Sequence, residues 1–138
     1  MTTKSSGFSL VELLVVIAII GVLSAVGTLT YQGYIAGTKK KTAKNAMMQI
    51  ALGQTEYYSN EGTYYYSDGC ESDTLVDDND GIEDELFNKG DVITYEMGYT
   101  MCIAEAGTSY LVVAQNATNA LRITLDGNGS FTETDLTD

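Results

Sequence analysis

The chain has 138 residues, which is enough for one compact domain and one long helix but too short for two independent cores. It contains no His, Trp or Pro, so the commonest general base and the commonest metal ligand are both missing, and an enzyme is not expected. The range from Asn45 to Asp138 contains 18 acidic residues but only two basic ones, Lys89 and Arg122. Its net charge of −16 opposes nucleic-acid binding.

A long apolar run follows a short polar start, MTTKSSG. The run extends from Phe8 to Leu29 and predicts a helix of roughly 33 Å, against about 30 Å of membrane hydrocarbon. Its one ionisable residue is Glu12, and burying a lone carboxylate in lipid costs about 2.5 to 3.5 kcal/mol, so Glu12 requires a cation. A cut between Gly7 and Phe8 would supply one, the new α-amino group. The pairing can form within one subunit, or between Glu12 of one subunit and Phe8 of the next, which would set the register of assembly.

The residues GFSLVELLVVIAIIGVLSAV resemble the processing and assembly segment of type IV prepilins, with Gly, then Phe, then Glu four residues on. The resemblance implies cleavage after Gly7 by a prepilin peptidase, N-methylation of Phe8, and a role for Glu12 in subunit register. Pseudopilins of type II secretion and competence pilins share this segment, so it identifies the superfamily and not the branch.

The usual helix kink of the family is in doubt here, because many pilins have a Pro where this chain has Leu29. Glycine weakens a helix by about 1 kcal/mol relative to alanine. We therefore expect local melting on assembly, if it occurs, between Gly21 and Gly27.

The second half of the helix is predicted to be amphipathic and to lie on a sheet. The stripe has helical three-four spacing and consists of Ala43, Ala46, Met47, Ile50, Gln54, Tyr57 and Tyr58. The helix is expected to stop near residues 60–62, where Gly62 favours a left-handed end. The stretch AKNAMMQIALGQTEYYSNEGTYY also resembles the minor-pilin and PilE-like branch, in which a Tyr-rich turn follows an Ala-rich face.

Alternating apolar and polar residues predict a strand over 94–103, and further strands are expected over 109–115, 121–125 and 131–134. The expected fold class is α+β, a long N-terminal helix packed on a small antiparallel sheet. We divide the chain into a leader peptide (1–7), a transmembrane or filament-core helix (8–30) and a periplasmic or extracellular head (31–138).

Cys70 and Cys102 form an even pair in a chain expected outside the cytoplasm, and we expect them to be bonded. Between them, the segment VDDNDGIED places Asp78, Asp80 and Asp84 at alternating positions of a calcium loop. The first and twelfth ligand positions lack carboxylates. The segment is therefore either a weak calcium site or a solvated acidic loop, and no other cofactor is expected.

Two further clusters have alternative interpretations. Lys39, Lys40, Lys41 and Lys44 either lie at a membrane surface or meet the acidic head of a neighbouring subunit. The tyrosines at 57, 58 and 64–66 form either an adhesive patch, part of an electron-conducting stack, or ordinary packing between helix and sheet.

The expected function is a structural subunit of a type IV pilus for adhesion, twitching motility or biofilm formation. The precursor would span the inner membrane once and then enter an extracellular filament of identical copies, with a prepilin peptidase and the pilus assembly machinery as partners. The alternatives are a type II secretion pseudopilin and a minor pilin of DNA uptake, the latter disfavoured by the acidic head.

Overall fold

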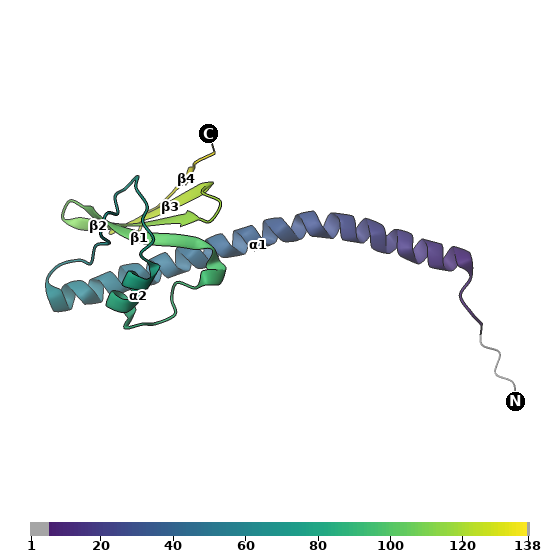
Figure 1. The fold of residues 1–138 in the computed structure, drawn as a ribbon, viewed down its shortest axis with the longest axis horizontal. Helices are drawn as coiled ribbons and strands as arrows, with labels where there is room; N and C mark the ends of the chain where they lie inside the picture. Colours follow the sequence, from purple (N-terminus) through teal and green to yellow (C-terminus); the bar gives the residue numbers. More distant parts are fainter. Residues whose placement is uncertain (1–5, 138) are drawn as a thin grey trace, which may run out of the picture. The chain divides into compact units, whose positions relative to one another are not determined.

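The computed structural model describes residues 6–137 (Figure 1). It has the predicted α+β arrangement, a long N-terminal helix and a four-stranded antiparallel sheet. The elements in chain order are α1 (Leu10–Glu61), α2 (Asn79–Phe87), the 3-10 turn η1 (Tyr95–Met97), β1 (Tyr99–Ala106), β2 (Ser109–Asn116), β3 (Leu121–Asp126) and β4 (Phe131–Asp135). The chain divides into two compact units between Gly37 and Thr38, and each is described by itself.

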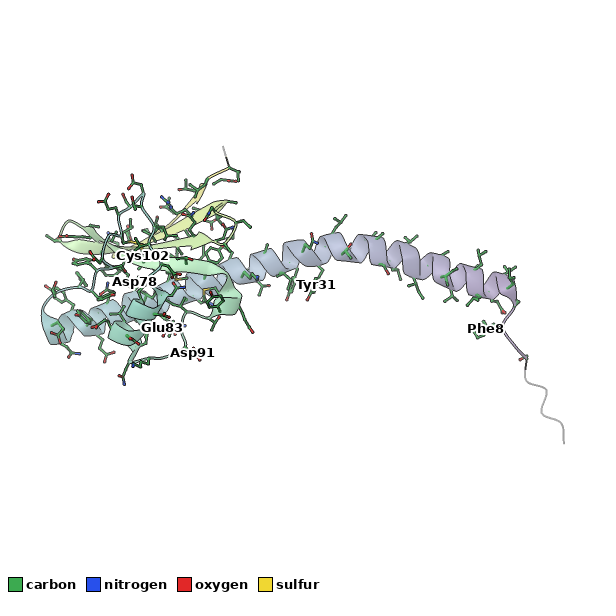
Figure 2. The ribbon with its side chains drawn as sticks, viewed as in Figure 1. Phe8, Tyr31, Asp78, Glu83, Asp91 and Cys102 are labelled. Atoms are coloured by element: carbon green, nitrogen blue, oxygen red, sulfur yellow. A yellow bond between two sulfur atoms is a disulfide. The ribbon has the colours of Figure 1, made fainter. Side chains whose placement is uncertain are left out.

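In the N-terminal unit, α1 is helical throughout and its large apolar side chains are exposed. The exposed fraction is 82% for Phe8, 80% for Leu10 and 76% for Leu29. Figure 2 shows the side chains between Phe8 and Tyr31 projecting from all sides of the helix. By length and composition this helix is able to cross a membrane. The helix continues through Gly21 and Gly27, and melting on assembly stays a prediction.

In the C-terminal unit, the last part of α1 packs along one face of the sheet (Figure 1). The buried residues of α1 are Ala43, Ala46, Met47, Ile50, Gly53 and Gln54, which confirms the first five positions of the predicted stripe, whereas Tyr57 is half-buried and Tyr58 is exposed. The helix ends at Glu61, and Gly62 follows with φ 75° and donates its N–H to the Tyr58 carbonyl at 2.9 Å. The left-handed stop predicted at this position is present.

The sheet has the strand order β1-β2-β3-β4, so that each strand pairs antiparallel with its neighbours in the sequence. The last three strands lie within one residue of their predicted ends. The face toward α1 contributes Met101, Ile103, Val112, Ala114, Ile123 and Leu125, all of them buried, to the main core. The two-residue periodicity of the strands is sufficient to predict this face.

The first strand was predicted to start too early. Residues 95–97 form the turn η1, which ends at Gly98 with φ 67°, and β1 begins only at Tyr99. Met97 is buried but Tyr95 is fully exposed, so the alternation that suggested a strand does not mark one face here. The Gly98 N–H bonds back to the Tyr95 carbonyl at 3.2 Å, and this tight turn replaces the expected extended start.

The opposite face of the sheet is covered by the loop that follows α1. Cys70 of this loop packs with Cys102, Ala104 and Val113 in a second, smaller cluster. Both faces of the sheet are therefore occupied, one by α1 and the other by the loop.

The same loop covers the free edge of β1. The Ser67 N–H donates to the Ile103 carbonyl at 2.9 Å, and its hydroxyl accepts from the Ile103 N–H at 2.9 Å. At the start of α2, Oδ1 of Asn79 accepts from the Met101 N–H at 2.8 Å and its Nδ2 donates to the Tyr99 carbonyl at 3.3 Å. These bonds satisfy backbone groups that an edge strand leaves open.

Candidate processing and assembly site

The start of α1 is closed by a reciprocal pair of hydrogen bonds. The Ser9 N–H donates to Oε2 of Glu12 at 2.8 Å, and the Glu12 N–H donates to Oγ of Ser9 at 3.2 Å. This is a capping box, which satisfies two donors at a helix N-terminus. Ser9 was not among the predicted site residues, although a Ser followed three residues later by a Glu just before an apolar run is the known sequence pattern of the motif.

The peptide bond between Gly7 and Phe8 lies outside regular structure and is exposed. Phe8 precedes α1 (Figure 2), and nothing lies within 4 Å of a Cβ built on Gly7. A bond in this state can enter the active site of a peptidase without unfolding the helix. Residues 1–5 of the expected leader lie outside the described residues.

Glu12 forms no ion pair within residues 6–137, where the ion pairs involve Glu133 alone. Its expected partner, the α-amino group of Phe8, does not exist while Gly7 is still attached. Four positions along a helix place the two groups on the same face, about one turn apart. The pairing therefore stays a prediction about the processed chain.

The disulfide joins Cys70 in the loop after α1 to Cys102 in β1, with an S–S distance of 2.01 Å and Cα atoms 6.0 Å apart. Both cysteines are buried, and Cys102 is labelled in Figure 2. The bond thus fixes the loop on the outer face of the sheet.

The structure does not form the calcium loop considered from the sequence. Residues 79–87 are the helix α2, so that Asp80 and Asp84 lie one helical turn apart instead of around a cation, and Asp78 precedes the helix. Asp78 accepts a hydrogen bond from the Tyr65 hydroxyl at 2.8 Å. Burial and then this hydrogen bond raise the pKa of Tyr65. Within residues 6–137, no three His, Cys, Asp or Glu side chains are grouped as a metal site.

A different acid of this segment has a defined partner set. Oε1 of Glu83 accepts from the Val92 N–H at 2.7 Å and from the Ile93 N–H. Its other oxygen, Oε2, is buried and has no hydrogen-bond partner in the described part of the chain. Glu83 fixes the loop between α2 and η1 to the helix (Figure 2).

Two of the four clustered lysines bind within their own chain. Nζ of Lys40 lies 3.1 Å from Oε2 of Glu133 in β4, and Nζ of Lys44 lies 2.5 Å from Oε1. Lys44 also lies over the ring of Phe131, 5.1 Å from its centroid. The hydrogen bonds from Lys44 and Lys40 lower the pKa of Glu133. The pair thus links α1 to the last strand.

The tyrosines pack mainly against one another. Tyr64 lies between Tyr58 and Tyr110, with ring centroids 4.6 and 4.9 Å away, and Tyr57 meets Tyr65 edge-on at 6.1 Å. They join the end of α1, the following loop and β2. This arrangement matches the packing interpretation of the cluster.

The comparisons with known proteins place the same N-terminal segment in a family. The family model "Prokaryotic N-terminal methylation motif" matches residues 2–28. The chain is 43% identical over 68 residues to the "Type IV major pilin protein PilE1" of Neisseria gonorrhoeae. This alignment covers 46% of this chain and 39% of that protein. It is 44% identical over 62 residues to "Fimbrial protein EcpC" of Eikenella corrodens, covering 42% and 38%.

A third relative is the "Type IV major pilin protein PilA" of Myxococcus xanthus, 31% identical over 61 residues, covering 44% of this chain and 28% of the relative. The matches thus span about two fifths or less of each relative's length. No solved structure matches the chain significantly. The matched residues include Gly7, Phe8, Ser9 and Glu12, the site built above. The chain is thus similar to type IV pilins, through the methylation motif over residues 2–28 and through alignments with these major pilins that cover less than half of its length.

Proposed function

We propose that the chain is a structural subunit of a type IV pilus, polymerised through the first half of α1. One observation carries the proposal. The helix that follows the accessible Gly7–Phe8 bond exposes apolar side chains on every side, and it starts with the Ser9–Glu12 capping box. Exposing such an apolar surface to water is unfavourable, whereas a lipid bilayer or a bundle of identical helices covers it.

The order of events follows from this arrangement. The precursor is held in the inner membrane by residues 8–30, with the head (31–138) on the outer side. A prepilin peptidase removes residues 1–7, Phe8 is N-methylated, and the assembly machinery moves the helix from lipid into the filament. Glu12 of one copy and the amine of another then form an ion pair in a medium of low dielectric constant, where misplacing either charge is costly.

Two other functions have less support. The relatives named above are described as major pilins and a fimbrial protein, and none of these descriptions mentions secretion or DNA uptake. A DNA-binding head needs a basic surface, whereas residues 45–138 of this head have a net charge of −16. We therefore propose adhesion or surface motility as the purpose of the filament.

Mass spectrometry of filaments sheared from cells that express the full chain tests the proposal. We expect a protein that starts at N-methylated Phe8 and lacks residues 1–7. A filament protein that keeps these residues, or a processed chain that never forms filaments, would contradict it.

The role of the Glu12 charge is separable from its capping role. Glu12→Gln keeps a side chain that can complete the capping box but removes the charge. We expect processing to continue and filament yield to fall at least about tenfold, since about 1.4 kcal/mol of lost pairing suffices for that factor. Glu61→Gln, the same substitution at the other end of α1, is the control and should leave the yield unchanged.

A further inference from the structure

A groove of about 450 Å³ opens between the end of α1 and α2. Glu56 and Tyr57 of α1 line one side, and Glu85 and Phe87 of α2 line the other. Both carboxylates are exposed, and neither forms an ion pair with any residue in the range 6–137. The groove therefore presents two free negative charges beside two aromatic rings.

The two helices add negative potential to the same place. The wall on α1 lies in its last two to three turns, and Glu85 and Phe87 are in the last turn of α2. Neither helix has a basic residue in its last turn, and the C-terminal end of a helix carries about half a negative charge. Lys89 follows α2 but is not among the residues that line the groove. The groove thus has a negative potential that favours a cation. None of the residues that line it is basic.

The head already contains one example of how it binds a lysine. Lys44 lies 2.5 Å from the Glu133 carboxylate and over the ring of Phe131. A carboxylate beside an aromatic ring is the combination that an ammonium group prefers, through an ion pair and a cation–π contact. The groove offers the same two kinds of group, twice.

We propose that this groove receives Lys41 of a second copy of the chain, as a contact between heads in the filament. Lys40 and Lys44 are held by Glu133, whereas Lys41 is exposed and has no ion-pair partner in the described part of the chain. Lys39 is less suited, because its Nζ lies beside Gly98 of its own head, 3.7 Å from the place of a Cβ. The inference rests on the proposed function and names one contact within it.

The chain cannot fill the groove with its own Lys41. The nearest lining residue of α1 is Gly53, twelve positions further along the helix, or about 18 Å at 1.5 Å per residue. A lysine side chain does not extend that far. Any bond between Lys41 and the groove therefore joins two copies.

Zero-length cross-linking uses this fact. Carbodiimide joins a lysine to a carboxylate that it touches, and peptide mass spectrometry identifies the pair in sheared wild-type filaments. We expect Lys41 linked to Glu85 or Glu56, and Lys44 linked to Glu133 as the internal control. Filaments that give the control link but no Lys41 link to the groove would overturn the inference and leave the proposed function intact.

A charge exchange tests the same contact. Lys41→Glu and Glu85→Lys are each expected to lower filament yield about fivefold to tenfold, because like charges then meet, and the double variant should restore it. Glu71→Lys, the same change at an exposed loop position, is the control and should have no effect. Single variants with wild-type yield, or a double variant no better than either, would contradict the inference.

If the wild-type chain forms no filament, the proposed function fails, and the cross-linking is then done on the full chain in membranes. There too, a Lys44–Glu133 link without a Lys41 link to the groove contradicts the contact.

Discussion

Gln54 is a fully buried amide on a helix face that otherwise packs apolar side chains. Its Nε2 donates to the Tyr65 carbonyl at 2.7 Å, and its Oε1 accepts from the Tyr65 N–H at 2.9 Å. One side chain thus satisfies both backbone groups of a residue in the loop that leaves α1. This is why a polar residue occupies a position in the predicted apolar stripe.

We expect Gln54→Leu to lower the free energy of unfolding by about 2 to 4 kcal/mol, because two backbone groups of Tyr65 lose their partners. Denaturant unfolding of the full chain in detergent measures this. Gln49→Leu, the same substitution at an exposed position of α1, is the control. Equal stability of the two variants would show that the bonds to Tyr65 contribute nothing.

Gly81 lies in the first turn of α2, where alanine normally stabilises a helix by about 1 kcal/mol. Here a Cβ would clash with Oδ1 of Asp78 and lie 2.8 Å from the Tyr65 hydroxyl oxygen. We expect Gly81→Ala to destabilise the head by about 1 to 3 kcal/mol instead. Thermal unfolding checks the sign, with Gly37→Ala in open space as the comparison. A more stable Gly81→Ala protein would contradict the packing described here.

At the scale of elements, the last strand is joined to α1 by charge. β4 is an edge strand whose Glu133 pairs with Lys40 and Lys44, and Phe131 packs under Lys44. The Glu133 side chain is 35% exposed, so the solvent screens these pairs. They position the strand more than they stabilise it.

The Glu133 contact gives a pH dependence of known sign. Its pKa is lowered from 4.5 by Lys44 and Lys40, so its stabilising effect is present above that pH and disappears as the pH falls through the lowered value. We expect the wild-type head to exceed Glu133→Gln in stability by less than about 1 kcal/mol at pH 7, and this difference to disappear at acidic pH once Glu133 is protonated in the folded as well as the unfolded chain. Unfolding at a series of pH values tests it. A difference that stays constant down to pH 3 would be inconsistent with this ion pair.

The disulfide holds the loop after α1 on the outer face of the sheet, where its own apolar cluster is small. It closes a loop with a sequence separation of 32 residues. In the chain-entropy description, we expect the Cys70→Ser/Cys102→Ser variant to lose roughly 3 to 4 kcal/mol of stability. Denaturant unfolding of oxidised wild-type protein and of the variant provides the comparison. A loss below about 1 kcal/mol would mean that the loop is held mainly by its bonds to the edge of β1.

At the scale of the whole molecule, the dominant property is negative charge, −12 overall with a pI near 4.1. If the chain forms filaments, heads on neighbouring filaments repel one another at neutral pH. We expect sheared filaments to stay dispersed at pH 7 and low salt, and to bundle as the pH approaches about 4, where the net charge vanishes. Light scattering against pH measures this. Bundling at pH 7 in low salt would show that attraction between heads outweighs their charge.

The sequence alone was enough to predict the long helix, its apolar and amphipathic halves, its end before Gly62, and three of the four strands. These features depend on the periodicity of apolar residues and on residues that end a helix or strand, and both can be recognised in a short stretch of sequence. The segment around Gly7, Phe8 and Glu12 also attracts attention in the sequence, because an acid inside an apolar run is rare and has few explanations, but its cleavage, methylation and ion pair stay predictions.

The tertiary structure decided which charges pair. Lys40 and Lys44 meet Glu133 about 90 residues further along the chain, and no local pattern distinguishes this acid from the others. The same holds for the segment 76–84, where the spacing of the acids suggested a calcium loop but helix α2 forms and Glu83 anchors the next loop. Local sequence sets the shape of each element, whereas contacts between distant acids and bases depend on how the elements pack, and only the folded chain shows that.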